Sequence, residues 1–186
     1  MSPVRLLVLG VLRLRGQAHG YAVHRELAAW RVDTWTRVKP GSVYHALKQL
    51  SKERKIKAVS VEESAEGPGR TRYELTQKGH AEFLALLEEA LSSMDIIELS
   101  AGVAFMQALS RPHVLRLLKA QHLRAQETRD GLEALKAHFP RREDPPHTPE
   151  LLDLWGGSLS ATIAWMGGLI HRLEAGEYVM AGERRA

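Results

Sequence analysis

Residues 40–75 read PGSVYHALKQLSKERKIKAVSVEESAEGPGRTRYEL, and two different periodicities follow each other within them. In residues 40–54 the apolar side chains recur three or four positions apart, which predicts an amphipathic helix with proline in its first turn. Residues 56–61 and 70–75 alternate instead, and the Gly-Pro-Gly run between them is a strong turn signal. The stretch therefore predicts a helix followed by a two-stranded hairpin.

The polar stripe of the predicted helix is basic and contains no acid. It consists of Gly41, His45, Lys48, Gln49 and Lys52. A helix fits the major groove of B-DNA, which is roughly 12 Å wide, and donors on its outer face can reach the base edges there. Free backbone N–H groups at the start of the helix suit a phosphate. An ordinary solvated helix face is the alternative interpretation of the same stripe.

Two further helices are predicted before this one. Residues 3–14 place apolar side chains on one helical face, and residues 21–31 do the same after a break at residues 15–20. Three helices and a hairpin in under eighty residues form the layout of a winged helix-turn-helix. The sequence thus predicts a mostly α fold with a small two-stranded β-wing, and we expect Arg70 and Arg72 near the tip of that wing.

Net charge separates the chain into two parts. Residues 1–78 contain 15 Lys/Arg and 7 Asp/Glu, a net charge of +8, whereas residues 79–186 contain 11 and 15, a net charge of −4. A basic N-terminal part beside a mildly acidic C-terminal part indicates that only the first meets a polyanion. Double-stranded DNA is the partner that this asymmetry predicts.

Several classes are disfavoured by what the sequence lacks. With no cysteine, disulfides, thiolate metal sites and cysteine nucleophiles are excluded, and a reducing cytoplasm is the expected location. No His-x-x-x-His pair, Gly-rich phosphate loop or nucleophile elbow is present, so we expect neither a metal, a cofactor nor an enzyme. The apolar runs at residues 6–12 and 159–170 are too short for an export signal or a membrane span.

The C-terminal part is predicted to be helical over residues 96–109, 111–139 and 151–173, with a Pro-rich loop at residues 141–149. In the last helix the following side chains are spaced four, three, four, three and four apart: Trp155, Leu159, Thr162, Met166, Leu169 and Leu173. This is the seam spacing of packed helices, and we interpret it as the dimerisation surface. The glycine pairs at 156–157 and 167–168 indicate either a closely approaching helix or an interruption of this one.

The N-terminal pieces, taken in order, resemble the PadR family of transcriptional regulators. The pieces are the first helix at residues 6–12, His19-Gly20-Tyr21, Gly41-Ser42-Val43-Tyr44 with Leu47 and Leu50, residues 67–73, and Leu75-Thr76-x-x-Gly79. The resemblance covers about residues 3–80, and Trp165 is similar to a tryptophan of the family's last helix. The pair Arg54-Lys55 departs from it, because the family usually has glycine and an aliphatic residue there. We expect a longer helix at that point, with two extra cations near the DNA backbone.

The resemblance implies a homodimeric repressor that binds a palindromic operator and is released by a small aromatic effector. Residues 1–79 would bind DNA, residues 80–178 would dimerise, and residues 179–186 would form a flexible tail. The expected DNA-binding residues are Lys39, Gly41, Ser42, Tyr44, His45, Lys48, Gln49, Lys52, Arg70 and Arg72. The expected effector pocket, between the two domains, uses His19, Tyr21, Trp155, Trp165 and His171.

Other interpretations remain open for several of these residues. Tyr21 and Tyr44 are equally compatible with core or domain-interface positions, and the tryptophans of the last helix with a core or dimer contact. A winged-helix module that binds proteins, or acts as a co-regulator without an effector, is the alternative function. The acid-free stripe and the wing arginines favour DNA, because a protein-binding surface would not require them.

Overall fold

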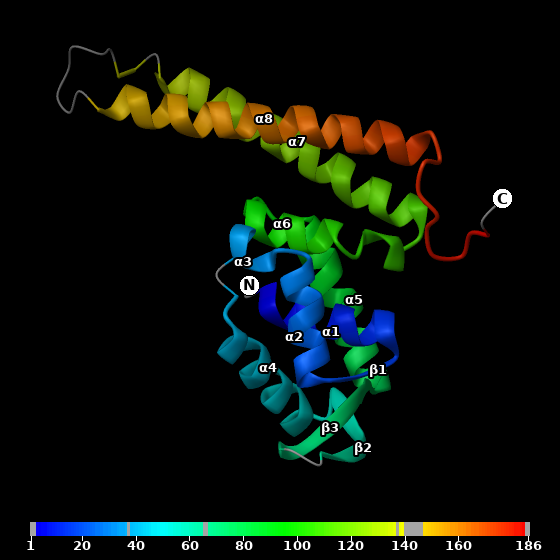
Figure 1. The fold of residues 1–186 in the computed structure, drawn as a ribbon. Coiled ribbons are helices and arrows are strands. Elements are labelled where there is room, and N and C mark those ends of the chain that lie inside the picture. Colours follow the sequence, from blue (N-terminus) through cyan, green and yellow to red (C-terminus); the bar gives the residue numbers. More distant parts are fainter. Residues whose placement is uncertain (1–2, 37, 65–66, 137, 140–146, 185–186) are drawn as a thin grey trace. The chain divides into compact units, whose positions relative to one another are not determined.

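The computed structural model describes residues 3–36, 38–64, 67–136, 138–139 and 147–184, with the side chains of residues 62–70 left out. The chain is mostly helical with a small antiparallel sheet, a winged-helix fold that confirms the predicted class. It divides into two compact units, residues 1–106 and 107–186 (Figure 1). The sequence predicted a boundary at residue 79 between a DNA-binding part and a dimerising part. That boundary concerns function, and it stays a prediction.

The N-terminal unit contains six α-helices among its described residues. These are α1 (Pro3–Arg15), α2 (Gly20–Ala29), α3 (Val32–Trp35), α4 (Pro40–Lys52), α5 (Gln77–Leu91) and α6 (Ile96–Val103). The helix α1 is central: residues 6–9, Val11 and Leu12 are fully buried, and the helix packs against α2, α4, α5 and α6. The short α3 was not predicted, because four residues are too few to show a helical period.

The sheet has three strands instead of the predicted two. Strands β2 (Ile56–Ser64) and β3 (Gly67–Leu75) form the hairpin, and β1 (Gln17–His19) pairs with the other edge of β3, in the order β1-β3-β2. Gly16 precedes β1 with a φ of 70°, the left-handed conformation that glycine adopts without strain. The sequence analysis interpreted residues 15–20 as a break between helices, because three residues cannot display an alternating pattern.

An aromatic cluster joins α6 to the rest of the N-terminal unit. The ring of Phe105 lies 5.6 Å from that of Trp30 and 5.7 Å from that of Phe83. A Cβ atom at Gly10 would come within 2.2 Å of the Phe105 ring, so only glycine lets this ring lie against α1. Phe105 thereby fixes the end of α6 in the same core as the three-helix domain.

The turn after α4 corrects the expectation of a longer helix. The helix ends at Lys52, and Arg54 adopts the left-handed conformation with a φ of 57°. The amide of Lys55 donates to the carbonyl of Leu50 (2.8 Å), and that of Arg54 donates to Ser51 (3.0 Å), which is the Schellman pattern of helix ends. The tight turn is therefore kept although arginine stands where glycine is usual.

The C-terminal unit is an antiparallel helical hairpin of α7 (Arg111–Lys136) and α8 (Thr148–Glu174), preceded by a short 3-10 helix, η1 (Met106–Ala108). Its antiparallel register is fixed at both ends by ion pairs. Lys119 lies 2.6 Å from Glu174, and Lys136 pairs with Asp153. The Pro-rich stretch predicted between the helices lies largely at residues 140–146, outside the described part of the chain.

The seam of α8 is used within a single chain. Met166, Leu169 and Leu173 are fully or almost fully buried, and α7 is the helix against which α8 packs. These three residues have no free surface for a second copy, so their assignment to the dimer interface is corrected. Leu159 and Thr162 are half-buried, and Trp155 keeps 51% of its surface exposed. Intramolecular and intermolecular helix pairs produce the same spacing, which is why sequence could not separate them.

The segment after α8 is packed against the start of α7, although we expected a flexible tail from residue 179. Met180 is buried, and the amide of Ala181 donates to the carbonyl of Leu109 (3.2 Å). Arg111 pairs with Glu183 at 2.6 Å and also donates to the carbonyl of Tyr178 (2.6 Å). The described residues 177–184 thus close the end of the helical hairpin.

None of the described helices combines the length and apolar character that crossing a bilayer requires.

Replacing Arg54 by glycine should stabilise the protein. The left-handed conformation costs an L-residue about 1–2 kcal/mol, and glycine avoids this cost. Glycine also makes the unfolded chain more flexible, which offsets part of the benefit, so we expect the free energy of unfolding to rise by about 1 kcal/mol. Urea denaturation would measure it, with Arg54→Ala as the control. That control removes the charge and keeps the strained conformation; an equal gain from both variants would show that backbone strain is not the cause.

Candidate nucleic-acid interface

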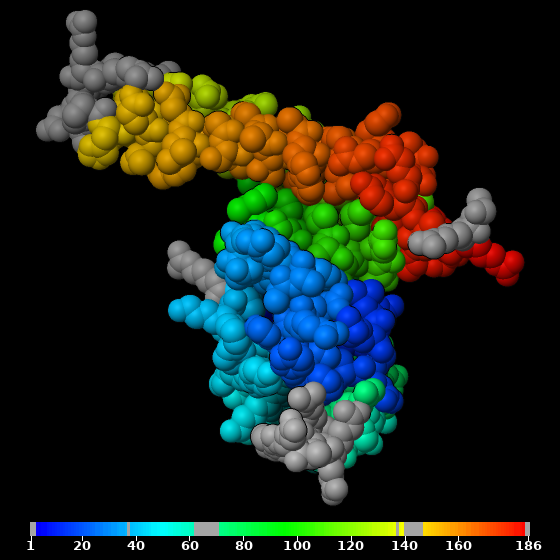
Figure 2. Space-filling model, viewed as in Figure 1, coloured from blue at the N-terminus to red at the C-terminus, as the bar shows by residue number. Residues whose placement is uncertain are grey.

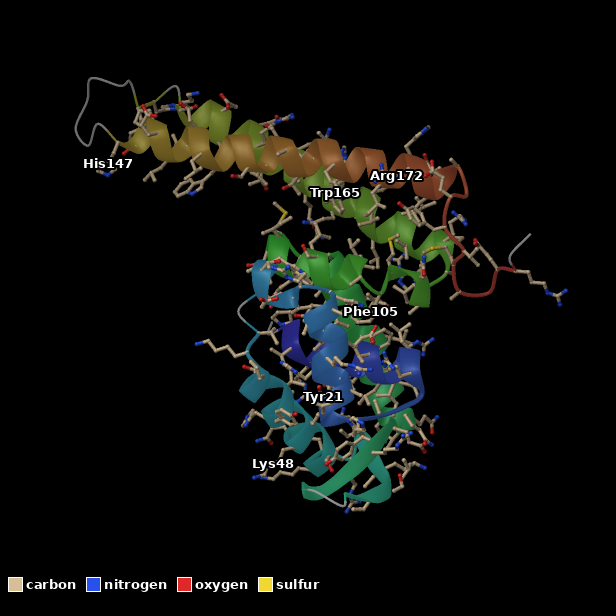
Figure 3. The ribbon with its side chains drawn as sticks, in the orientation of Figure 1. Tyr21, Lys48, Phe105, His147, Trp165 and Arg172 are labelled. Atoms are coloured by element: carbon tan, nitrogen blue, oxygen red, sulfur yellow. The ribbon has the colours of Figure 1, made fainter. Side chains whose placement is uncertain are left out.

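The outer face of α4 is exposed as the sequence predicted. Gly41, Tyr44, His45, Lys48 and Lys52 lie at the surface, and Ser42 and Gln49 are half-buried. The opposite face is buried in the unit through Val43, Ala46, Leu47 and Leu50. Figure 3 shows Lys48 on the outer side of α4, pointing away from the other helices of its unit. The helix therefore has one face anchored in the core and one basic face available for a partner.

The start of α4 carries no competing acceptor. Lys39 is the N-cap residue and makes no side-chain hydrogen bond to the first turn, which contains no acid. Beside it, Gly41, Ser42, His45 and Gln49 line an open cleft of about 550 Å³. The cleft's other wall is the start of α1, through Val4 and Arg5, which the sequence analysis did not include. The N-terminal part of this helix is thus open to an anionic or polar ligand.

The charges at the end of α4 are neutralised by the fold. Arg5 donates to both oxygens of Glu53 (2.6 and 3.0 Å) and to Glu82, and this hydrogen bonding to Glu53 raises the arginine pKa and lowers that of Glu53. Lys55 pairs with Glu82 at 2.7 Å. The acid nearest to the basic face is therefore held toward α1. Of the two extra cations expected near DNA, Lys55 is engaged in this network, and Arg54 remains exposed.

The wing places its two arginines differently from the prediction. Arg72 lies in the central strand, paired in register with His19 of β1 and Ser60 of β2, and is half-buried. It is therefore part of the body of the sheet and not of the wing tip, and this position corrects the prediction. The reason is that the hairpin is longer than predicted, since β2 continues to Ser64 and β3 begins at Gly67. The backbone of Arg70 pairs with Glu62 closer to the turn, whereas its side chain lies outside the described residues.

An aromatic group lies where α2 meets α4. Tyr44 packs so closely on α2 that a Cβ at Gly20 would lie 2.8 Å from its ring. His19 and Tyr21 stack with ring centroids 6.2 Å apart, and Tyr21 remains 52% exposed. His19 also caps α2, because its Nδ1 accepts the amide hydrogen of Ala22 (3.0 Å). The cap gives His19 a structural role that the sequence analysis did not foresee.

The residues predicted for an effector pocket belong to both compact units. His19 and Tyr21 lie in the first unit, and Trp155, Trp165 and His171 lie on exposed positions of α8 in the second. Trp165 is 42% exposed and is visible on α8 in Figure 3. The structure does not bring these residues together within either unit, so an effector pocket made of them stays a prediction. Among the described residues no His, Asp or Glu cluster suits a metal ion.

These features define the class of the N-terminal unit: a winged helix-turn-helix with a basic, exposed third long helix. The family model described as "Transcriptional regulator PadR-like family" matches residues 8–85. The resemblance to the PadR family predicted from the sequence is therefore confirmed over these residues. Among curated protein sequences, none matches this chain.

Solved structures of PadR proteins are similar at low identity. Bacillus subtilis PadR in complex with operator DNA is 18% identical over 91% of this chain and 98% of that chain, with a TM-score of 0.39. The same protein in complex with p-coumaric acid is 19% identical over 92% and 99%, with a TM-score of 0.38. The protein smu.1604c from Streptococcus mutans UA159 is 17% identical over 90% and 98%, with a TM-score of 0.40. We base the family assignment on the match over residues 8–85 alone.

Replacing His19 by alanine should destabilise the first unit, because α2 loses the acceptor at its N-terminus. Loss of such a cap costs about 0.5–2 kcal/mol. His19→Asn is the matched control, since asparagine caps a helix well and also lacks the stacked ring. We expect the urea midpoint to fall clearly more for alanine than for asparagine. Equal midpoints for the two variants would contradict a capping role.

Proposed function

We propose that the chain is a DNA-binding repressor that inserts the outer face of α4 into the major groove. The observation that carries this proposal is the exposed basic face itself, which holds His45, Lys48 and Lys52 while its nearest acid, Glu53, is tied to Arg5. Lysines there supply phosphate contacts, and Gln49 offers both a donor and an acceptor to a base edge. A winged helix that binds proteins would not require a basic face from which the nearest acid is held away.

We further propose a homodimer formed through the face of α8 that α7 leaves uncovered. This exposed stripe consists of Leu154, Gly157, Ala161, Ala164, Trp165 and Gly168. Figure 2 shows α8 as a continuous ridge, coloured from yellow to orange. At about 1.5 Å per residue a 27-residue helix is about 40 Å long, enough for an interface of ordinary size.

The glycines of α8 support this proposal. The helix runs without interruption from Thr148 to Glu174, so the glycine pairs do not break it. Among the described residues, and apart from the adjacent backbone of α8, nothing lies within 4 Å of a Cβ at Gly157, and a Cβ at Gly168 would meet the guanidinium end of Arg172 at 3.3 Å. Each glycine in a helix interior costs about 1 kcal/mol relative to alanine. A second α8 that approaches closely would account for small residues along the stripe.

A dimer places two copies of α4 on one duplex, so a palindromic operator with half-sites about one helical turn apart follows from two-fold symmetry. Repression, release by a small effector and a cytoplasmic location rest on the PadR-like match and on the sequence. The same match favours a regulator over an enzyme. The second candidate is a winged-helix module that binds proteins, which the tests below separate from a DNA-binding protein.

The DNA-binding proposal is tested by salt dependence. The affinity of the full chain for a duplex from upstream of its own gene should fall steeply as salt rises. The double variant Lys48→Gln/Lys52→Gln should flatten the slope of log K against log salt by about 1 for each lysine. Lys78→Gln, which removes an exposed lysine of α5, should leave the slope unchanged. A slope that neither variant changes would show that α4 does not meet the phosphates.

The dimer proposal is tested by mass in solution. Trp165→Arg places a charge in the exposed stripe at a position that the single chain leaves 42% exposed, so the helical hairpin should still form. Light scattering should report a dimer for the native chain and a monomer for this variant at micromolar concentration. Ala120→Arg, at an exposed position of α7, should remain dimeric. A monomeric native chain, or a dimeric Trp165→Arg, would contradict the stripe as interface.

A further inference from the structure

A second cleft of the N-terminal unit lies at the helix-turn-helix itself, away from the basic face of α4. It has a volume of about 390 Å³ and is bounded by α2, α3 and the segment that leads into α4. Its floor is aliphatic, since Leu27, Val32 and Val43 line it and are almost completely buried. Clefts that hold small organic ligands have volumes of about 300–1,000 Å³, are mostly apolar and carry a few polar groups.

The charged groups around this cleft favour an anion. Arg31 and Lys39 line it together with His24, and Asp33 is the single acid among the lining residues. Within the described part of the chain, neither Arg31 nor Lys39 forms an ion pair or a side-chain hydrogen bond. The cleft also borders the start of α4, where the helix dipole favours negative charge. One carboxylate would therefore find two permanent cations against one acid.

We propose that this cleft binds a small aliphatic carboxylate, whose chain lies against Ala28 and Val38 above the aliphatic floor and whose carboxylate group is held by Arg31 and Lys39. No Phe, Tyr or Trp is among the described residues that line the cleft, which suits a flexible alkyl chain better than a stacked ring. The cleft lies wholly within the first unit and uses none of the residues expected for the effector pocket.

Occupancy of the cleft has a consequence for DNA binding, and this part rests on the proposed function. Lys39 lines the cleft and is also the cap residue of α4, where a phosphate of the duplex is expected. A carboxylate bound to Lys39 neutralises that cation and competes with the phosphate. The bound acid also joins α2 and α3 to the start of α4, and a ligand that prefers one placement of α4 shifts the population toward it. The acid should therefore lower the affinity for DNA.

The binding test uses the full ¹⁵N-labelled chain, with hexanoate as the probe and hexanamide as its neutral analogue. Titration with hexanoate should shift the amide signals of Leu27, Val32 and Val43 in a saturable way, and hexanamide should bind about tenfold more weakly, the loss expected for a charge-assisted contact. Lys39→Gln should weaken hexanoate by a similar factor without changing the affinity for hexanamide. Equal affinities for acid and amide would overturn the carboxylate assignment.

A matched pair of variants tests the location of the site. Ala28 and Ala29 are adjacent exposed residues near the end of α2, and only Ala28 lines the cleft. Ala28→Phe should fill the cleft and abolish the shifts, whereas Ala29→Phe should retain them. Circular dichroism confirms that both variants fold. Hexanoate binding that survives Ala28→Phe would overturn the proposed site.

The effect on DNA is measured on the same samples at fixed ionic strength. Saturating hexanoate should lower DNA affinity roughly threefold or more in the native chain and in Ala29→Phe, and not in Ala28→Phe. Hexanoate binding without any change in DNA affinity would overturn the regulatory part while the site stands. If the ligand-free chain fails to bind DNA, the proposed function fails, and the amide shifts still decide whether the cleft holds the acid.

Discussion

The carbonyl group of Lys55 is the point at which the recognition helix, the wing and α5 are joined. The backbone amide and the hydroxyl of Thr76 both donate to it at 3.0 Å, and the same hydroxyl accepts the amide hydrogen of Gly79 (3.1 Å) at the start of α5. A Cβ at Gly79 would lie 2.0 Å from this carbonyl oxygen, so a side chain there would separate the two segments. The pattern Leu-Thr-x-x-Gly after the hairpin is thus a requirement of this junction.

The junction explains why α4 can be rigid at one end and open at the other. Its C-terminal end is held by the Schellman turn and by the ion pairs that connect Arg5, Glu53, Lys55 and Glu82. Its N-terminal end, by contrast, has a cap residue without a capping side chain and is bordered by two clefts. The anchored C-terminal end fixes the position of the helix, and the open N-terminal end leaves its polar groups accessible to a partner. A helix that reads a groove needs both, because misplaced donors do not reach the base edges.

Sequence alone predicted the parts of the fold that depend on long periodic segments. The amphipathic pattern of residues 40–54 located both faces of α4, and the turn signal located the hairpin. It failed where a segment is too short to have a period, as for β1. It also made the hairpin too short: the pairing continues to Ser64 and Gly67, so Arg72 lies in the body of the sheet and not at the wing tip. It also could not tell that the seam of Met166, Leu169 and Leu173 packs within one chain. One cleft is lined by three separate segments and the other by two, so no local sequence pattern could predict them.

The side chains of α4 set a limit on what one copy can recognise. In the proposed complex, lysine contacts phosphate or base as a point charge, so Lys48 and Lys52 would add affinity with little discrimination. Gln49 is the outward residue with a bidentate group, and one such pair supplies about 1–3 kcal/mol of discrimination between bases. Specific regulators bind their sites about 4–10 kcal/mol more tightly than other DNA. A single α4 of this composition supplies less discrimination than that. Two copies of α4 on one duplex would double the free energy of discrimination. The exposed stripe of α8 and the small number of base-reading side chains on α4 therefore both favour the proposed dimer.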